Sequence, residues 1–243
     1  MANGNPEANI ALLIDADNAS PDTLDTALTV LAELGTVNIR RVYGNWAKTA
    51  LKGWATMTHS RALDPQQQFD VTKGKSATDM KMTIDAMDLL MRGHIQGFGI
   101  MSSDSDFMPL AMRIRQEGLP VYGFGTAKTP ESFRQACTRF IDVSAVKEAA
   151  EAAEAAGPGE TDKAAKAPPV DAALVEILGQ AVRASKRDER GFASLSEVGQ
   201  RASARSSFDA RNYGFARLGD LIASLSNFTT EKRDGAIYVK RVR

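Results

Sequence analysis

The sequence has a single cysteine, Cys137, so no disulfide can form within the chain. Together with only two histidines, this cysteine cannot supply the four ligands of a usual cysteine-based zinc site. No apolar run reaches the length that crosses a membrane. The residues before Ile10 also lack the charged start and apolar centre of a signal peptide. We therefore expect a cytoplasmic protein without membrane contact, a disulfide framework or a zinc centre.

A net charge of either sign is also lacking, because 30 Lys+Arg residues balance 30 Asp+Glu residues. The charges are nevertheless unevenly placed along the chain. Residues 170–243 contain 13 basic and 9 acidic residues, and arginine supplies most of the surplus. A basic surplus confined to one part of a chain is a mild indication of nucleic-acid contact there.

Two apolar runs end in acidic residues. Residues 10–18 read IALLIDADN and residues 98–106 read FGIMSSDSD. Such runs are typical of strands that are buried on both faces of a parallel sheet. In open α/β sheets the functional groups lie just beyond the carboxyl ends of the strands. The polar side chains at these two ends are Asp15, Asp17, Asn18, Asp104 and Asp106.

Strands alternate with helices over the first 144 residues. Further strands are expected at 37–43, 119–124 and 140–143, with a short one within 62–71. This alternation predicts a three-layer α/β/α sandwich with a mostly parallel sheet. A long helix is predicted at 78–91, capped by Thr78, with Asp79 in its first turn. Its expected buried stripe is Met80, Ile84, Met87 and Met91.

The composition changes after residue 144. Residues 145–169 are rich in Ala, Glu, Lys, Gly and Pro, so we expect a linker whose first half extends the preceding helix. Residues 170–243 predict three helices and then a hairpin that turns at Asp234-Gly235. Ser194 and Glu197 resemble a capping box at the second helix. This order predicts a small winged-helix α+β domain.

The acids of the first domain suggest a metal site. Asp15, Asp79, Asp104 and Asp106 would repel one another unless a counter-charge lay between them, and Mg²⁺ or Mn²⁺ takes oxygen ligands. A bound metal of this kind can promote hydrolysis of a phosphodiester. Asp104 could instead act as a helix cap and Asp17 as the acceptor of a turn at Asn18, and Asp85 could simply pair with Lys81.

Three segments of the first domain resemble the NYN domain, a relative of the PIN ribonucleases whose bacterial branch is called LabA-like. They are IALLIDADN, KGKSATDMKMTIDAMDLL and FGIMSSDSDFMPL, and they span most of residues 8–143 in the family's order. The resemblance implies a Mg²⁺- or Mn²⁺-dependent ribonuclease in which Asn18 orients substrate or a ligand. The implied metal ligands are Asp15, Asp79, Asp104 and Asp106, with Asp17 and Asp85 contacting the metal only indirectly.

The C-terminal segments FASLSEVGQRASA and FDARNYGFARLGDLIASLSNFTTEKRDGAIYVKRV resemble the OST-HTH/LOTUS winged helix, which implies RNA binding. Phosphate contacts are expected from arginines and from the hairpin. The candidates are Arg201, Arg205, Arg211, Arg217, Lys232 and Arg233. In the first domain the candidates are Lys48, Lys52, Lys73, Lys75 and Trp46, although a packed tryptophan is the commoner case.

The sequence supports two main hypotheses. The first is a metal-dependent ribonuclease that acts on single-stranded RNA and is delivered to it by the winged helix. The second is a non-catalytic RNA-binding regulatory protein that retains the fold. A phosphatase of the haloacid-dehalogenase type is a weaker reading, because Asn18, Ala19 and Ser20 follow the DxD where that family has a threonine. Domains of this type often pair, so a homodimer is also expected.

Overall fold

The computed structural model describes residues 8–69, 76–156, 172–233 and 235–242. The chain divides into two units, Ala2–Ser144 and Ala145–Arg243, and each is described by itself. Within the described residues, no helix has the combination of length and hydropathy that crossing a membrane requires.

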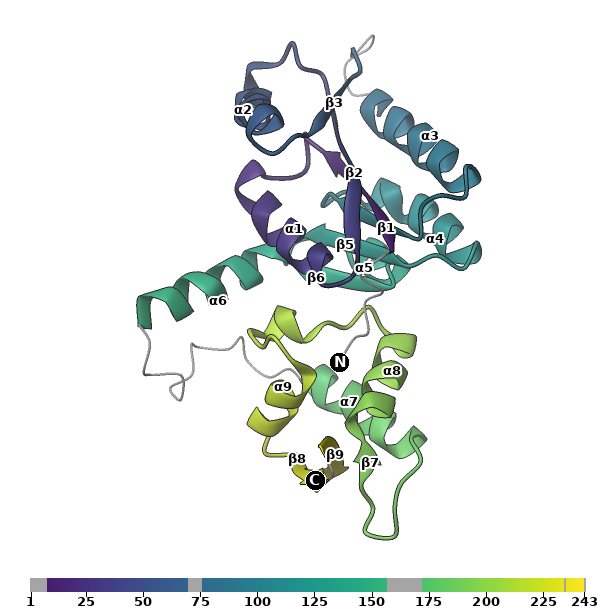
Figure 1. The fold of residues 1–243 in the computed structure, drawn as a ribbon, viewed down its shortest axis with the longest axis vertical. Coiled ribbons are helices and arrows are strands. Elements are labelled where there is room, and N and C mark those ends of the chain that lie inside the picture. The colour runs from purple at the N-terminus through teal and green to yellow at the C-terminus, as the bar shows by residue number, and fades with distance from the viewer. Residues whose placement is uncertain (1–7, 70–75, 157–171, 234, 243) are drawn as a thin grey trace. The chain divides into compact units, whose positions relative to one another are not determined.

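A sheet of six strands forms the centre of the first unit, in the order β3-β2-β1-β4-β5-β6 (Figure 1). Every neighbouring pair of strands is parallel. The short strand expected near Pro65 is present at the edge of the sheet, where proline is tolerated because an edge strand leaves some of its N–H groups unpaired. The strands are β1 Asn9–Asp15, β2 Thr36–Gly44, β3 Asp64–Gln67, β4 Gly97–Met101, β5 Val121–Gly125 and β6 Arg139–Asp142.

Helices cover both faces of this sheet, with α1 on one side and α3 and α4 on the other (Figure 1). Side chains of β1 alternate between the two layers, because Ala11 and Leu13 belong to the core cluster that contains α3 and α4. The three-layer α/β/α sandwich is therefore confirmed. The helices of this unit are α1 Leu24–Ala32, α2 Lys52–Ser60, α3 Ala77–Met91, α4 Met108–Gln116 and α5 Glu131–Ala136. Helix α6 Val143–Ala156 begins at the end of this unit and belongs mostly to the second. Three 3-10 turns accompany them: η1 Pro21–Thr23, η2 Thr49–Leu51 and η3 Ser105–Phe107.

Helix α3 turns a different face to the sheet from the one predicted. Its buried side chains include Met82, Ala86, Leu89 and Leu90, whereas the predicted stripe faces outward, with Met80, Ile84 and Met91 exposed and Met87 only partly buried. The helix has two apolar faces, and the one that carries small Ala86 packs against β1 and β2. The predicted cap was also wrong, because Ser76 is the N-cap and Thr78 is buried.

The second unit has the predicted winged-helix order of three helices and a hairpin. Its sheet has the antiparallel order β7-β9-β8. The predicted capping box is wrong: Ser194 is the N-cap, but Glu197 accepts from the Lys186 backbone N–H and pairs with Arg201 instead. Tyr213, Phe215 and Leu218 pack against the core of the domain. The elements are α7 Ala172–Ala184, β7 Ala193–Ser194, α8 Leu195–Arg205, η4 Ala210–Tyr213, α9 Leu218–Ser224, β8 Phe228–Arg233 and β9 Ala236–Arg241.

Candidate functional site

The candidate site lies where the strand order reverses. From β1 the chain proceeds through β2 and β3 to one edge of the sheet, and through β4, β5 and β6 to the other. Loops that leave two adjacent strands in opposite directions open a crevice beyond their carboxyl ends. Asp15 is the last residue of β1, and Asp104 and Asp106 follow β4. The topology therefore brings together the two acidic segments that the sequence singled out.

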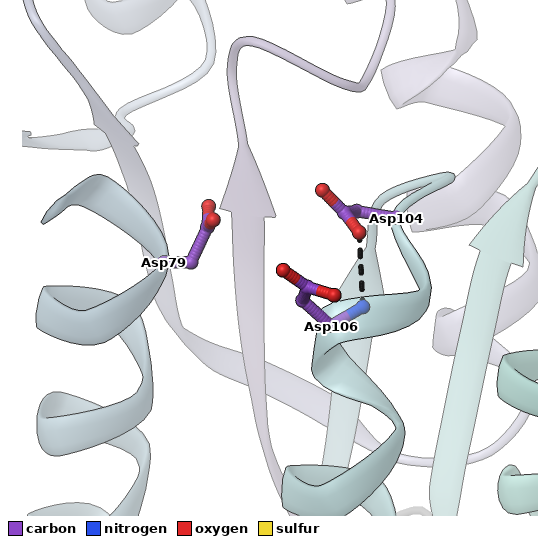
Figure 2. A group of neighbouring side chains, drawn as sticks. All are labelled: Asp79, Asp104 and Asp106. Carbon is purple, nitrogen blue, oxygen red and sulfur yellow. Dashed lines mark hydrogen bonds between the residues drawn. The ribbon is translucent and has the colours of Figure 1, made fainter. Parts of the chain in front are cut away.

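Three carboxylates gather at this crevice. Asp79, Asp104 and Asp106 each offer one oxygen atom, and these atoms all lie within 4.8 Å of one another. Figure 2 shows Asp79, from the first turn of α3, facing Asp104 and Asp106. Asp104 is the N-cap of η3, where its Oδ1 accepts the backbone N–H of Asp106 at 2.9 Å. This cap fixes Asp104 and Asp106 relative to each other.

Asp15 does not belong to this group of three. Its side chain is completely buried, and both of its carboxylate oxygens accept hydrogen bonds. Oδ2 accepts from the Ser102 hydroxyl at 2.8 Å and from the Asn18 amide at 2.9 Å, and Oδ1 accepts from the Asp17 backbone N–H at 3.1 Å. The structure thus brings together three of the four predicted ligands, whereas the fourth, Asp15, is buried at the end of β1.

Burial and the charges of neighbouring carboxylates shift the pKa values of Asp79 and Asp15. Burial, followed by the charge of Asp15, raises the pKa of Asp79 to about 6, and the charges of Asp104 and Asp106 add to the shift. Burial also raises the pKa of Asp15, against the hydrogen bonds from Asn18 and Ser102. In the described part of the chain, Asp79, Asp104 and Asp106 make no ion pair with a basic side chain, so their charge stays uncompensated.

The two acids expected to contact the metal indirectly lie elsewhere. Asp85 accepts a hydrogen bond from the Tyr43 hydroxyl at 3.1 Å, and its carboxylate is 3.5 Å from Arg41 and 3.7 Å from Lys81. It therefore connects α3 to β2. The half-exposed Asp17 pairs with Lys48 at 3.4 Å, and its backbone rather than its side chain contacts Asp15.

The basic and aromatic candidates of the first unit have mixed surroundings. Lys73 and Lys75 lie outside the described residues. Lys48 is paired with Asp17, whereas Lys52 is exposed. The half-buried Trp46 donates its indole N–H to the Gln66 carbonyl at 3.2 Å, which holds the ring against β3.

The arginines of the second unit divide into paired and solvent-facing groups. Arg211 is only 12% exposed and pairs with the buried Asp209 at 3.2 Å, so it stabilises the domain. Arg201 pairs with Glu197 at 2.7 Å, and Arg205 donates to Gln180 at 3.3 Å. Arg217, like the hairpin lysine Lys232, is exposed.

A second arginine of this unit is held by several neighbours. Arg233 pairs with Asp188 and Glu231, and its guanidinium lies 4.9 Å from the centre of the Phe192 ring. These contacts raise its pKa further above its already high ordinary value, chiefly through the hydrogen bonds that the guanidinium donates to Glu231 and Asp188. We therefore regard Arg233, like Arg211, as a stabilising residue of the second unit.

Two residues were missed in the sequence. Ser102 is fully buried, and its hydroxyl also accepts the Asp104 backbone N–H at 3.0 Å, so it links Asp15 to the second acidic segment. Its position two residues before Asp104 was the available signal. Phe69 follows β3 at the same edge of the sheet and is 64% exposed. The signal in the sequence was a large aromatic residue within a polar segment.

The family model of the NYN domain matches residues 9–145, which is more than half of the chain. The chain belongs to the NYN domain family. A second model, that of the OST-HTH/LOTUS domain, matches residues 167–239. The NYN domain has a PIN-like nuclease fold, and the LOTUS domain indicates a role in RNA binding. The acidic group lies within the NYN domain, beyond the carboxyl ends of its strands.

Two similar proteins each match part of the chain. The uncharacterized protein MJ0482 of Methanocaldococcus jannaschii is 30% identical over 131 residues, which are 50% of this chain and 51% of that protein. The chain thus spans about half the length of this relative. The crystal structure of VPA0982, a protein of unknown function from Vibrio parahaemolyticus, is 17% identical with a TM-score of 0.45, covering 57% of this chain and 94% of that chain.

Proposed function

We propose that the NYN domain is a metal-dependent ribonuclease that hydrolyses RNA phosphodiester bonds. The observation that carries this proposal is the group of three carboxylates, Asp79, Asp104 and Asp106, at the strand-order reversal. Carboxylate oxygens are the donors that Mg²⁺ and Mn²⁺ prefer. A cation between them would also relieve the repulsion that helps to raise the pKa of Asp79. The donor set therefore fits the expected metal, with these three aspartates as its ligands.

When bound, such an ion supplies charge neutralisation at the phosphate and a more acidic water as the nucleophile. The remaining residues of the site would act by positioning. The Asp15 carboxylate accepts hydrogen bonds from the Ser102 hydroxyl and from the side-chain amide of Asn18. The backbone carbonyl of Asn18 accepts the Ser103 backbone N–H at 3.2 Å. These bonds tie the loop after β1 to the loop after β4. We therefore assign Asp15 and Asn18 to holding Asp104 and Asp106 in place.

We assign RNA binding chiefly to the second unit, with residues 145–169 as the linker between a nuclease domain at 1–144 and a LOTUS domain at 170–243. The exposed Arg217 and Lys232 are the leading phosphate contacts, followed by Arg201 and Arg205. In the NYN domain, the exposed ring of Phe69 is suited to stacking on an unpaired base, which favours single-stranded RNA.

The test uses the full chain and end-labelled single-stranded RNA, with Mn²⁺, with Mg²⁺ or with EDTA. We expect cleavage that requires a metal and is lost in Asp104→Asn. The matched control is Glu117→Gln, an acid-to-amide change just after the C-terminal end of α4, away from the acidic edge. Calorimetric titration of Mn²⁺ without RNA should show binding by the wild type and by Glu117→Gln, and not by Asp104→Asn.

Three other results would contradict the nuclease proposal. Cleavage that persists in Asp104→Asn would place the activity elsewhere or in a contaminant. RNA binding without cleavage by the wild type would favour the second candidate function, a non-catalytic RNA-binding protein. Cleavage by the wild type without detectable Mn²⁺ or Mg²⁺ dependence would remove the metal from the mechanism.

A further inference from the structure

The outward face of helix α3 is an exposed apolar stripe, which we define as Met80, Ile84, Met87 and Met91. The exposed fractions are 67% for Met80, 55% for Ile84 and 64% for Met91, and Met87 is partly exposed. Spacings of four, three and four residues place all of these side chains on one face of a helix. The stripe therefore runs along almost the whole length of α3, about 16 Å at 1.5 Å per residue.

The core of the NYN domain uses little of this stripe, because Met80, Ile84 and Met91 lie outside it and only the partly buried Met87 packs against it. The opposite face of α3 already fills the core with Met82, Ala86, Leu89 and Leu90. A helix that is apolar on both faces is usually covered on both. Isolated exposed apolar residues are common, but a continuous row of large ones marks an interaction surface.

The charges beside the stripe indicate what covers it. Lys81 and Asp88 lie on the same flank, seven residues and therefore about two turns apart. Within the described residues Asp88 is exposed and makes no ion pair, and the ion pair of Lys81 is a 3.7 Å contact with Asp85. If a second α3 packed antiparallel on the stripe, Lys81 of each copy would lie opposite Asp88 of the other. In a parallel pair, the flank that carries Lys81 and Asp88 would lie on opposite sides of the interface in the two copies, so these two residues would not meet.

We propose that the α3 stripe is a homodimer interface in which two copies of this chain pack antiparallel, with Lys81 and Asp88 paired across it. A twofold axis makes such a surface self-complementary, because Met80 of one copy meets the Met91 end of the other. RNA fits this face poorly, since it carries no aromatic residue and its flank holds Asp85 and Asp88 beside Lys81. The interface does not depend on the proposed nuclease activity.

The first test is sedimentation velocity on the full chain over a range of concentrations. We expect the mass of two chains for the wild type and of one chain for Ile84→Lys, which places a charge in the centre of the stripe. The matched control is Val242→Lys, because Val242 is also apolar and 53% exposed but lies outside α3. It should remain dimeric. Since Ile84 is exposed, circular dichroism should show that Ile84→Lys is folded.

The second test exchanges the charges. Lys81→Glu and Asp88→Lys should each weaken dimerisation about three- to tenfold, because each change places like charges together at two symmetric positions. The double variant restores opposite charges and should recover the wild-type dimer constant. A monomeric wild type at every concentration, a dimer that Ile84→Lys leaves intact, or a double variant weaker than both single variants would each overturn the proposal.

Discussion

The Ser102 hydroxyl donates to Asp15 Oδ2 at 2.8 Å and accepts the Asp104 backbone N–H at 3.0 Å. One buried side chain therefore joins the end of β1 to the acidic segment after β4. Asp104 belongs to the proposed metal site, whereas Asp15 is buried at the end of β1. The geometry of the site thus depends on a residue that would not itself contact the metal.

Replacing Ser102 with alanine should lower both stability and activity. The change removes one of the hydrogen bonds to a buried carboxylate, so we expect the free energy of unfolding to fall by about 1–3 kcal/mol. The change also removes the acceptor of the Asp104 backbone N–H, so Asp104 is held less firmly. The rate of metal-dependent cleavage should therefore decrease as well. Urea denaturation and the cleavage assay measure the two effects, with Ser60→Ala as the control because Ser60 is an exposed hydroxyl on α2. Equal stability of the two variants would contradict this prediction.

Asp79→Asn should stabilise the metal-free protein at neutral pH. Folding raises the pKa of Asp79 from 3.8 to about 6, so the folded state binds the proton more tightly. The stability of the wild type therefore decreases as the pH rises from 3.8 to about 6. The variant has no carboxyl group at this position, so its stability does not decrease in this way. Above about pH 6 it should therefore be more stable than the wild type, by about 1 kcal/mol after solvent screening. Thermal denaturation in EDTA across this range measures the difference, and a variant less stable than the wild type at neutral pH would contradict the prediction.

Affinity for Mn²⁺ should fall as the pH drops through 6. A carboxylate binds a metal only when it is deprotonated, and the pKa of Asp79 is about 6. We expect binding at about pH 5 to be about tenfold weaker than at about pH 7.5. Calorimetric titration at both values tests this expectation. An affinity that does not change between them would indicate that Asp79 is not a ligand.

Asp85→Asn should reduce stability without abolishing Mn²⁺ binding. The carboxylate accepts from Tyr43 and pairs with Arg41 and Lys81, so its charge is used in packing α3 on β2. We expect the free energy of unfolding to decrease by about 1–2 kcal/mol. Denaturation and Mn²⁺ titration of the same preparation separate the two roles. Loss of Mn²⁺ binding with unchanged stability would instead support a role at the metal, as the family resemblance implied.

Arg217→Ala and Arg211→Ala should differ in what they affect. Arg217 is exposed, so its loss should weaken RNA binding and reduce the dependence of log affinity on log salt concentration by about 0.7. Arg211 pairs with the buried Asp209, so its loss should reduce stability by about 1–3 kcal/mol. Filter binding at several salt concentrations and thermal denaturation measure both. A folded Arg211→Ala of normal stability with weakened RNA binding would reverse the assignment.

The layer architecture and the region of the site could be predicted from the order of residues alone. Strands of a parallel sheet are buried on both faces, so they appear as apolar runs, and the polar residues that end such runs mark the functional edge. This reasoning located β1 and β4 and their acidic ends, Asp15, Asp104 and Asp106, without any tertiary information. The winged-helix order of the second unit could also be predicted from local signals, namely helical periodicity and an Asp-Gly pair that favours a hairpin turn.

Which of several equivalent side chains meet depends on how the helices and strands pack together in three dimensions. Helix α3 carries two apolar faces, and the strands that it packs on selected the one with Ala86 and Leu89 and left Met80 and Ile84 outside. Asp15 ends β1 and Asp104 follows β4, yet the hydroxyl of Ser102 and the side-chain amide of Asn18 donate hydrogen bonds to the carboxylate of Asp15. Such outcomes depend on distances between segments far apart in the chain, and local periodicity contains no information about those distances.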